Sequence, residues 1–196
     1  MFSIFKKKKD KETKEKNISA IIITDLHGLG DTMQEELKAA FSQNYDVCFI
    51  LGDCYENDIA YLSKYLDTSK TFGVSGNHDA GDIYERYGIE NIHGKKIIVK
   101  NKPFVGWGGS VKYKPSVIGM SQDESIDFEK DLPEADYLVA HDGPFDESDP
   151  NIAHQGLKGI SNYQNRTKCF IIRGHRHTKY ETNIERCFYG VERCQL

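Results

Sequence analysis

The residues of this chain best suited to chemistry are acidic, amide and imidazole side chains in short segments far apart in the sequence. The segments are Asp25-Leu26-His27, Gly52-Asp53, Gly76-Asn77-His78-Asp79, His141 and Gly174-His175-Arg176-His177. Seven of these residues offer an oxygen or nitrogen donor: Asp25, His27, Asp53, Asn77, His141, His175 and His177. With one shared carboxylate and a water, such a set is about what two divalent metal ions need. The sequence therefore predicts a dinuclear metal site.

Each donor segment follows an apolar run that predicts a buried β-strand. The runs occupy residues 19–24, 47–51, 71–75, 137–140 and 169–172. Apolar residues recur at helical spacing in 31–42 and 57–66, between the first three runs. This alternation predicts an α/β fold with parallel strands, in which ligand groups collect beyond the carboxyl ends of the strands. We therefore expect the donors to meet at one edge of the sheet, with Asp25 and His27 on one face of an extended strand end.

The remaining segments predict shorter elements. We expect a weak helix at 83–87, a hairpin of 96–100 and 103–107, helices at 123–130 and up to about 165, and antiparallel strands within 180–191. The Gly-rich stretch 108–121 is expected to be a loop. Asp31 or Thr32 is expected to cap the first helix, and Asn57 or Asp58 the second.

Composition favours one globular domain over residues 18–196. A chain of 196 residues can bury a single core, and none of its apolar runs approaches the ~18–20 residues of a membrane-spanning helix. The five cysteines are odd in number and lack CxxC spacing, which argues against a disulfide framework or a thiolate zinc site. Reduced thiols and the lack of a secretory signal pattern predict a cytoplasmic protein.

Residues 1–17 differ from the rest of the chain, because they hold seven lysines against three acidic residues. Such a tail ahead of an acidic domain predicts a disordered, solubilising arm. The alternative is weak membrane contact, with Phe2, Ile4 and Phe5 in the interface and the lysines near anionic lipid.

The five donor segments, in this order and behind strands, resemble those of the calcineurin-like metallophosphoesterases. The resemblance spans residues 19 to about 191. It implies an α/β fold in which two mixed β-sheets pack as a sandwich with helices on both outer faces. It also places the metals at one edge of that sandwich.

The resemblance assigns the donors to two ions. It implies that one metal is held by Asp25, His27, Asp53 and His177, and the other by Asp53, Asn77, His141 and His175, with Asp53 bridging. A bridging carboxylate offsets the repulsion between two dications. Imidazole ligands favour manganese, iron, zinc or a similar ion over magnesium. The implied reaction is hydrolysis of a phosphoester by a metal-bridging hydroxide.

The resemblance also implies two catalytic residues beside the metals. His78 would donate a proton or hydrogen bond to the leaving oxygen, and Glu56 would steady its cationic form. Asn57 stands where the protein-phosphatase branch has a phosphate-gripping arginine, and Asp79 where that branch usually has glutamate. These departures favour the compact, phosphodiesterase-like bacterial members.

Other functions stay open at this stage. The alternatives are a phosphomonoesterase or protein phosphatase, and a non-catalytic scaffold of the same fold. We expect a small phosphoester substrate, since the acidic domain argues against tight nucleic-acid binding; the oligomeric state is open. His93 and His154 are expected to be structural or surface residues, and Trp107 to pack under its loop. Arg176 either contacts phosphate or faces solvent.

Overall fold

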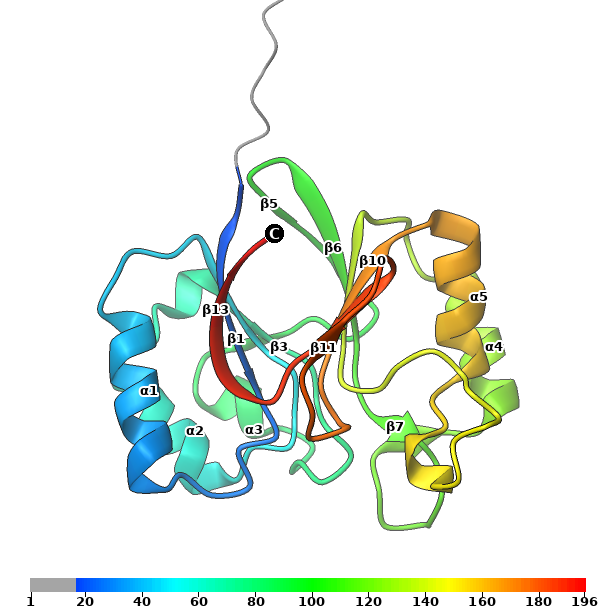
Figure 1. Cartoon of the computed structure of the whole chain (residues 1–196), viewed down its shortest axis with the longest axis horizontal. Helices are drawn as coiled ribbons and strands as arrows, with labels where there is room; N and C mark the ends of the chain where they lie inside the picture. The colour runs from blue at the N-terminus through cyan, green and yellow to red at the C-terminus, as the bar shows by residue number, and fades with distance from the viewer. Residues whose placement is uncertain (1–16) are drawn as a thin grey trace, which may run out of the picture.

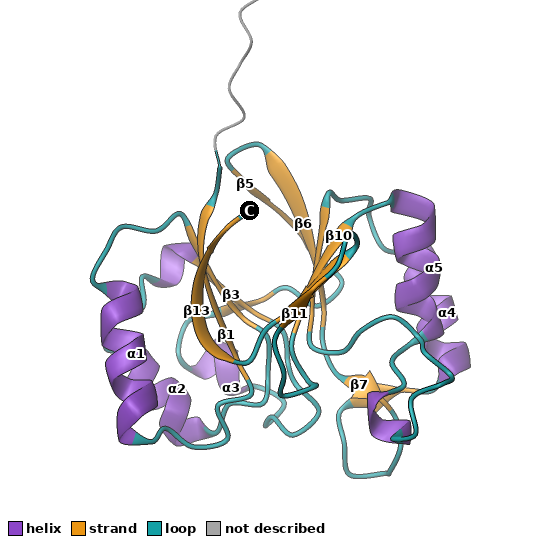
Figure 2. Ribbon diagram, in the orientation of Figure 1, coloured by secondary structure: helices purple, strands orange, loops and turns teal. Residues whose placement is uncertain are grey.

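Two β-sheets lie face to face between two layers of helices (Figure 1). The computed structural model describes residues 17–196. One sheet has five strands in the order β13-β1-β2-β3-β4, and the other has six in the order β11-β12-β10-β9-β6-β5. The helices lie outside both sheets (Figure 2). The predicted α/β sandwich is confirmed.

The five-stranded sheet is parallel except at one edge. It contains β1 (Ser19–Thr24), β2 (Val47–Ile50), β3 (Thr71–Gly73), β4 (Glu90–Asn91) and β13 (Gly190–Gln195). β1 to β4 run parallel, while β13 pairs antiparallel with β1. Its outer layer consists of α1 (Asp31–Phe41), α2 (Glu56–Leu62) and α3 (Ile83–Arg86).

The six-stranded sheet has a parallel centre and two antiparallel hairpins. Its strands are β5 (Lys96–Val99), β6 (Lys102–Trp107), β9 (Tyr137–Ala140), β10 (Phe170–Arg173), β11 (Tyr180–Glu181) and β12 (Glu185–Cys187). β6, β9, β10 and β12 are parallel, and β5–β6 and β11–β12 are the hairpins. Its outer layer is α4 (Gln122–Lys130) and α5 (Lys158–Thr167).

Strand residues divide between an inner core and two outer ones. On β1, Ile21 and Ile23 pack against the α1–α3 layer, whereas Ala20 and Ile22 face the second sheet. On β9, Val139 belongs to the inner core and its neighbour Leu138 to the α4–α5 side. Both faces of these strands are therefore apolar, which explains the continuous runs in the sequence.

The structure corrects several element boundaries. The stretch 108–121 is not all loop: β7 (Ser110–Val111) and β8 (Gly119–Met120) pair in parallel. A Cβ at Gly119 would lie 2.3 Å from the Ser110 carbonyl oxygen, so the pairing depends on glycine. Two 3₁₀ turns, η1 (Thr68–Lys70) and η2 (Ile152–His154), were also not predicted.

The two helix starts also differ from the prediction. Gly30 is the N-cap of α1 and Tyr55 that of α2, so Asp31 and Asp58 lie inside the first turns instead. α2 stops at Leu62 rather than near residue 66, because the amides of Lys64 and Tyr65 bond three residues back, to Tyr61 O at 3.3 Å and Leu62 O at 2.8 Å.

Two global predictions bear on the described residues. None of the helices within 17–196 is long and apolar enough to cross a membrane. All five cysteines are buried and free. The lysine-rich segment up to residue 16 lies outside the described residues, so its predicted roles stay predictions.

Candidate metal centre

The donor segments meet at the end of the sandwich where the parallel strands of both sheets finish. Asp25 follows β1 and His141 follows β9, so the two sheets contribute ligands side by side. Backbone hydrogen bonds join the loops: Asp25 N donates to Gly52 O at 3.0 Å, and Gly174 N to His141 O at 3.2 Å. Donors 150 residues apart in the sequence, such as Asp25 and His175, therefore share one small volume.

The backbone of this centre adopts left-handed conformations at residues other than glycine. The φ angles are 52° at Asp25, 45° at His27, 53° at Asp53, 72° at His175 and 49° at His177. Each such residue costs of order 1–3 kcal/mol, and clusters of them are typical of functional sites. The extended strand end predicted for Asp25 and His27 is therefore wrong, because the chain turns sharply after Thr24 to bring both side chains inward.

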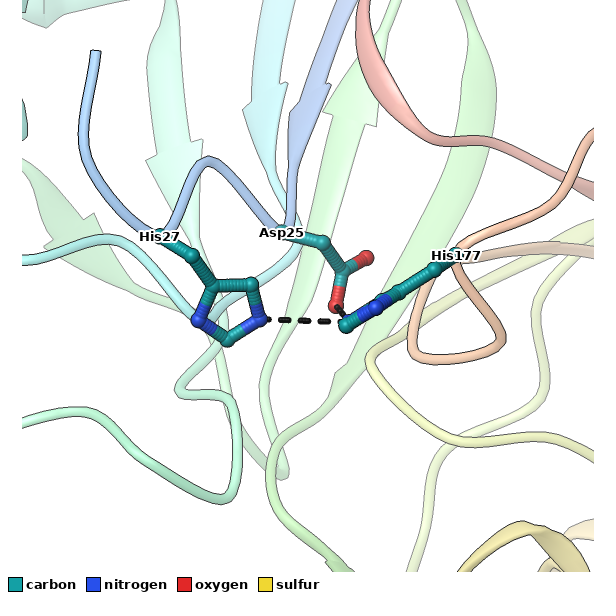
Figure 3. A group of neighbouring side chains, drawn as sticks. All are labelled: Asp25, His27 and His177. Carbon is teal, nitrogen blue, oxygen red and sulfur yellow. Dashed lines mark hydrogen bonds and ion pairs between the residues drawn. The ribbon is translucent and has the colours of Figure 1, made fainter.

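Asp25, His27 and His177 form the first ligand group (Figure 3). His27 Nε2 lies 3.2 Å from His177 Nε2, and His177 Nε2 lies 3.4 Å from Asp25 Oδ1. Asp25 Oδ2 accepts from Thr24 Oγ1 at 2.6 Å and from His175 N at 2.9 Å. Asp25 Oδ1 is buried and has no hydrogen-bond partner within residues 17–196. An unsatisfied buried carboxylate oxygen between two imidazoles fits a cation ligand.

Asp53, His141 and His175 form the second group, with Asn77 beside them. His141 Nδ1 lies 2.7 Å from the Leu51 carbonyl, which can only accept, so the ring donates there. In the neutral ring Nε2 then carries a lone pair, and it faces Asn77 Oδ1 at 2.8 Å. His175 Nε2 likewise donates to the Ala153 carbonyl at 2.7 Å, which leaves its Nδ1 for the ligand group.

Asp53 connects the two groups. Its Oδ2 lies 3.6 Å from His27 Nε2 and 3.7 Å from His141 Nε2, while Oδ1 accepts from His78 N at 2.8 Å. Ligands about 2.1 Å from one ion lie about 3.0–3.4 Å from each other, close to these separations. The position of Asp53 therefore suits the bridging role that the family resemblance implies.

The centre contains two buried carboxylates, whose negative charge a bound cation would compensate. Asp25 and Asp53 are 0% and 2% exposed. Burial disfavours the charged form of His141, but Asp53 and Asp25 outweigh it and raise the pKa of this imidazole. Burial and the neighbouring His141 lower the pKa of His175. Carboxylates, imidazoles and an amide oxygen are donors that divalent transition ions bind, so the residues fit such ions.

Two further carboxylates, the buried Asp58 and the half-buried Asp79, hold the ligand loops in place. Asp58 accepts from Gly28 N at 3.0 Å and from Leu29 N and Tyr55 N, both at 2.9 Å, which ties the His27 loop to the Asp53 loop. Sequence reasoning considered Asp58 only as a helix cap. The sequence feature that could have pointed to this role is its place as the third residue of a short helix that follows a donor loop.

Asp79 makes the equivalent connection between the next two loops. It accepts from Cys54 N at 2.9 Å, Gly76 N at 2.7 Å and the Tyr84 hydroxyl at 2.8 Å. Burial raises its pKa, although these hydrogen bonds oppose the shift. A Cβ at Gly76 would lie 2.1 Å from Asp53 Oδ1, so glycine is required where the loops touch.

The structure places all the predicted site residues except Glu56 around one pocket or directly beneath it. The pocket has a volume of about 110 Å³ and is lined by His27, Asp53, Asn77, His78, Tyr113, Ala153, His154, His175 and His177. His78 is exposed at its rim, with its ring 6.2 Å from that of His27. Glu56 is 55% exposed and pairs with Arg86 at 2.5 Å. Within the described chain its side chain shows no interaction with His78.

Sequence reasoning missed three residues that line the pocket, Tyr113, Ala153 and His154. The Asn77 amide nitrogen donates to the Tyr113 hydroxyl at 3.1 Å, and no periodicity in the Gly-rich stretch pointed to Tyr113. His154, expected to be structural or at the surface, lines the pocket with its ring 5.2 Å from that of His175. The 3₁₀ turn η2 brings it there.

The other side chains singled out in the sequence have structural partners. His93 stacks on Phe128 with ring centroids 4.6 Å apart, and its Nδ1 accepts from Gly108 N at 2.9 Å. Trp107 is fully buried, as expected. Arg176 pairs with Asp149 at 2.6 Å rather than facing solvent alone.

Comparisons with known proteins agree with this geometry. A family model described as calcineurin-like phosphoesterase matches residues 18–179. The fold is similar to the crystal structure of TT1561 of Thermus thermophilus, with 15% sequence identity, coverage of 89% of both chains and a TM-score of 0.58. A second solved structure has 14% identity, coverage of 88% of this chain and 90% of the other, and a TM-score of 0.59. No curated protein matches the chain in sequence.

Proposed function

This chain belongs to the calcineurin-like phosphoesterase family, and we propose on that basis that it hydrolyses phosphodiesters at a centre of two divalent metal ions. The family implies metal-dependent phosphoester hydrolysis. The observation that carries the finer proposal is Asp53, whose Oδ2 lies within 3.7 Å of imidazoles from both ligand groups. One carboxylate between two donor groups supports a pair of ions.

The residues would divide between the two ions as the family resemblance implies. One would be held by Asp25, His27, His177 and Asp53, and the other by Asp53, Asn77, His141 and His175. When bound, the ions would supply Lewis acidity toward phosphoryl oxygens and would acidify the attacking water. The imidazole content favours manganese, iron or zinc.

The chain's own contribution to bond cleavage would come from His78. It stands exposed at the pocket rim, where a leaving alkoxide can reach it, and imidazole is a common general acid in hydrolysis. The bond from His78 N to Asp53 Oδ1 fixes the backbone of this residue relative to the ligand groups. The supporting role predicted for Glu56 remains a prediction, and its pairing with Arg86 favours a surface role instead.

The charge of the pocket supports a diester over a monoester. None of the described residues that line it is lysine or arginine. A phosphomonoester carries about −1.5 to −2 at neutral pH, whereas a diester carries about one negative charge and needs less compensation. Asn57, in place of an arginine, agrees with this preference. Phosphomonoesterase or protein-phosphatase activity is the second candidate, and the complete ligand set disfavours a non-catalytic scaffold.

The proposed setting of the enzyme follows from its thiols and charge. Five buried, unpaired cysteines support a reducing compartment such as the cytoplasm. The net charge of −4 supports a small phosphoester as substrate rather than nucleic acid.

A turnover panel with measured metal content tests the proposal. The chain is loaded with manganese and given an aryl diester, an aryl monoester, cyclic nucleotides and a phosphopeptide. We expect about two ions per chain and a higher kcat/KM for diesters. Two bound ions with a preference for the monoester or phosphopeptide would support the second candidate, and no bound ion with no turnover would support a scaffold.

A further inference from the structure

A second hollow lies directly beside the metal centre. It has a volume of about 340 Å³ and opens between the His27 loop, α1 and the start of α2. Its walls include Gly28 and Leu29 from the loop, Gln34 from α1, and Tyr55 and Tyr61 around α2. A volume of this order can hold an organic group of the size of a nucleoside.

The hollow and the metal pocket meet along neighbouring residues. His27 lines the metal pocket, and Gly28, the next residue, lines the hollow. The Tyr55 ring contacts the His27 ring edge-on, with centroids 5.9 Å apart. Tyr55 is 51% exposed, so its ring stands at the boundary between the two spaces. One substrate can therefore place its phosphate at the metal centre and an attached group in the hollow.

The polar groups of the hollow are effectively uncharged. Its single charged side chain among the described residues is Asp58, and both of its oxygens already accept backbone N–H groups. The Gln34 amide nitrogen donates to Leu29 O at 3.4 Å, which leaves its oxygen available. The Asn57 amide has no hydrogen-bond partner within residues 17–196 and faces this space with both donor and acceptor.

These groups select a particular ligand chemistry. Two tyrosine rings, Tyr55 and Tyr61, offer flat apolar surface, and two amides offer hydrogen bonds. None of the lining residues is a lysine or arginine, and the nearby Lys64 ammonium lies over the Tyr61 ring, 4.8 Å from its centroid. A flat, uncharged group with hydrogen-bonding edges fits, and the nucleobase of a nucleoside is the common example.

We propose that this hollow binds the organic ester group of the substrate, and that this group is a nucleoside. The inference rests on the proposed function, because the phosphodiester bond must be cleaved at the adjacent centre. Asn57 is central to it, since an arginine at this position would put a cation into the hollow. The uncharged amide of Asn57 therefore leaves the lining of the hollow without a cationic side chain.

Two diesters with the same leaving group test the proposal. Thymidine 5′-(p-nitrophenyl) phosphate carries a nucleoside, whereas methyl p-nitrophenyl phosphate does not, and both release p-nitrophenolate. With the manganese-loaded chain we expect the KM of the nucleoside ester to be about tenfold lower. Gln34→Leu keeps the side-chain size but removes the amide, and should raise that KM about three- to tenfold while leaving the methyl ester unchanged.

A matched control is available on the opposite side of the molecule. Gln164 is half-buried on α5 and covers the other sheet, so Gln164→Leu makes the same chemical change away from the hollow. It should leave the KM of both diesters unchanged. Asn57→Arg is the second test variant, because it places a long cationic side chain in the hollow. It should abolish the preference for the nucleoside ester.

The outcomes separate this proposal from the proposed function. Equal KM values for the two diesters, or a preference unaffected by Gln34→Leu and Asn57→Arg, would overturn the nucleoside site and leave the hydrolase intact. If neither diester is hydrolysed, the proposed function fails. The nucleoside site is then tested separately, by measuring thymidine binding to the zinc-loaded full chain with saturation-transfer NMR. Binding that Asn57→Arg removes supports it, and absence of binding overturns it.

Discussion

Each buried imidazole at the centre uses one ring nitrogen to fix its orientation and presents the other to its ligand group. His141 donates through Nδ1 to a carbonyl on the opposite sheet, and His175 donates through Nε2 to the carbonyl of Ala153. These bonds set the tautomers before an ion arrives, which reduces the ordering required on binding. The two rings therefore present different nitrogens, a distinction that residue type alone does not reveal.

Asp25→Asn should keep or raise the stability of the metal-free protein but weaken its metal binding. In the wild type Asp25 Oδ1 is buried without a partner in the described chain, and Asp53 adds a second negative charge nearby. A neutral amide removes this charge, so the metal-free variant should unfold at the same or a higher temperature than the metal-free wild type. Added manganese should then raise the Tm of the variant much less than that of the wild type. Calorimetry with and without chelator measures both effects, and an undiminished metal-induced shift would contradict the assignment.

His78→Ala should slow hydrolysis without reducing the amount of bound metal. The side chain of His78 lies at the pocket rim, whereas its backbone makes the bond to Asp53, and alanine keeps that backbone bond. We expect kcat to fall about 10²- to 10⁴-fold, with unchanged metal content by elemental analysis. A variant as fast as the wild type would refute the role of His78.

Tyr113→Phe should weaken metal binding through Asn77. The Tyr113 hydroxyl accepts from the amide nitrogen of Asn77, which turns the amide oxygen toward His141. Phenylalanine keeps the ring but removes this acceptor, so the affinity for the second ion should fall about 10- to 100-fold in a metal titration. Tyr189→Phe is the control, because the Tyr189 ring stacks on His177 at 5.4 Å and its hydroxyl has no hydrogen-bond partner in the described chain. Equal affinities for the two variants would exclude the orienting role.

The sequence supports prediction of the ligands but not of how the backbone presents them. Asp25 and His27 could be identified by type and position after a strand, yet their left-handed φ angles of 52° and 45° carry no signal in residue type. Such angles are stable only where surrounding contacts hold them. Tyr113 illustrates the same limit, because its contact with Asn77 depends on the pairing of β7 with β8.

At the scale of elements, the loops around the centre are held to one another by single carboxylates. Asp58→Asn leaves one oxygen for three backbone N–H groups and turns an NH₂ toward at least one of them. The variant should lose about 1–3 kcal/mol of unfolding free energy in denaturant, and its metal affinity should fall because the His27 loop loosens. Asp67→Asn is a suitable control: Asp67 caps η1 at the surface, where asparagine caps equally well. A loss no larger than that of the control would show that Asp58 does not hold the loops.

Elements could be predicted where a run of residues was long enough to be periodic. β1 and β6, of six residues each, and β2, β9 and β10, of four each, coincide with apolar runs. β4, β7 and β8 contain two residues each and have no pattern to detect. Their positions depend on neighbouring strands and on glycines that permit close approach, and both are properties of the folded chain.

At the scale of the whole molecule, periodicity indicated the strands but not their neighbours. The C-terminal β13 returns to pair antiparallel with β1, so Ser19 lies opposite Gln195. Nothing in either segment specifies the other, since both are six-residue strands whose sequences do not reveal which strand lies beside them. The division of strands between two sheets followed only from the family resemblance, which is a comparison of motif order rather than a physical derivation.

The centre lies across the two sheets, so metal binding should stabilise the sandwich as a unit. Asp25, His27, Asp53 and Asn77 follow strands of one sheet, whereas His141, His175 and His177 follow strands of the other. An ion that binds only the folded state adds about 4 kcal/mol at a thousand times its Kd. Because Asp53 joins the donor groups, chelation should lower the Tm and increase hydrogen exchange at the carboxyl ends of β1, β2, β9 and β10 together. Hydrogen exchange is measured by mass spectrometry, with remetallated protein as the control. An increase confined to one sheet after chelation would show that the ions bind that sheet alone.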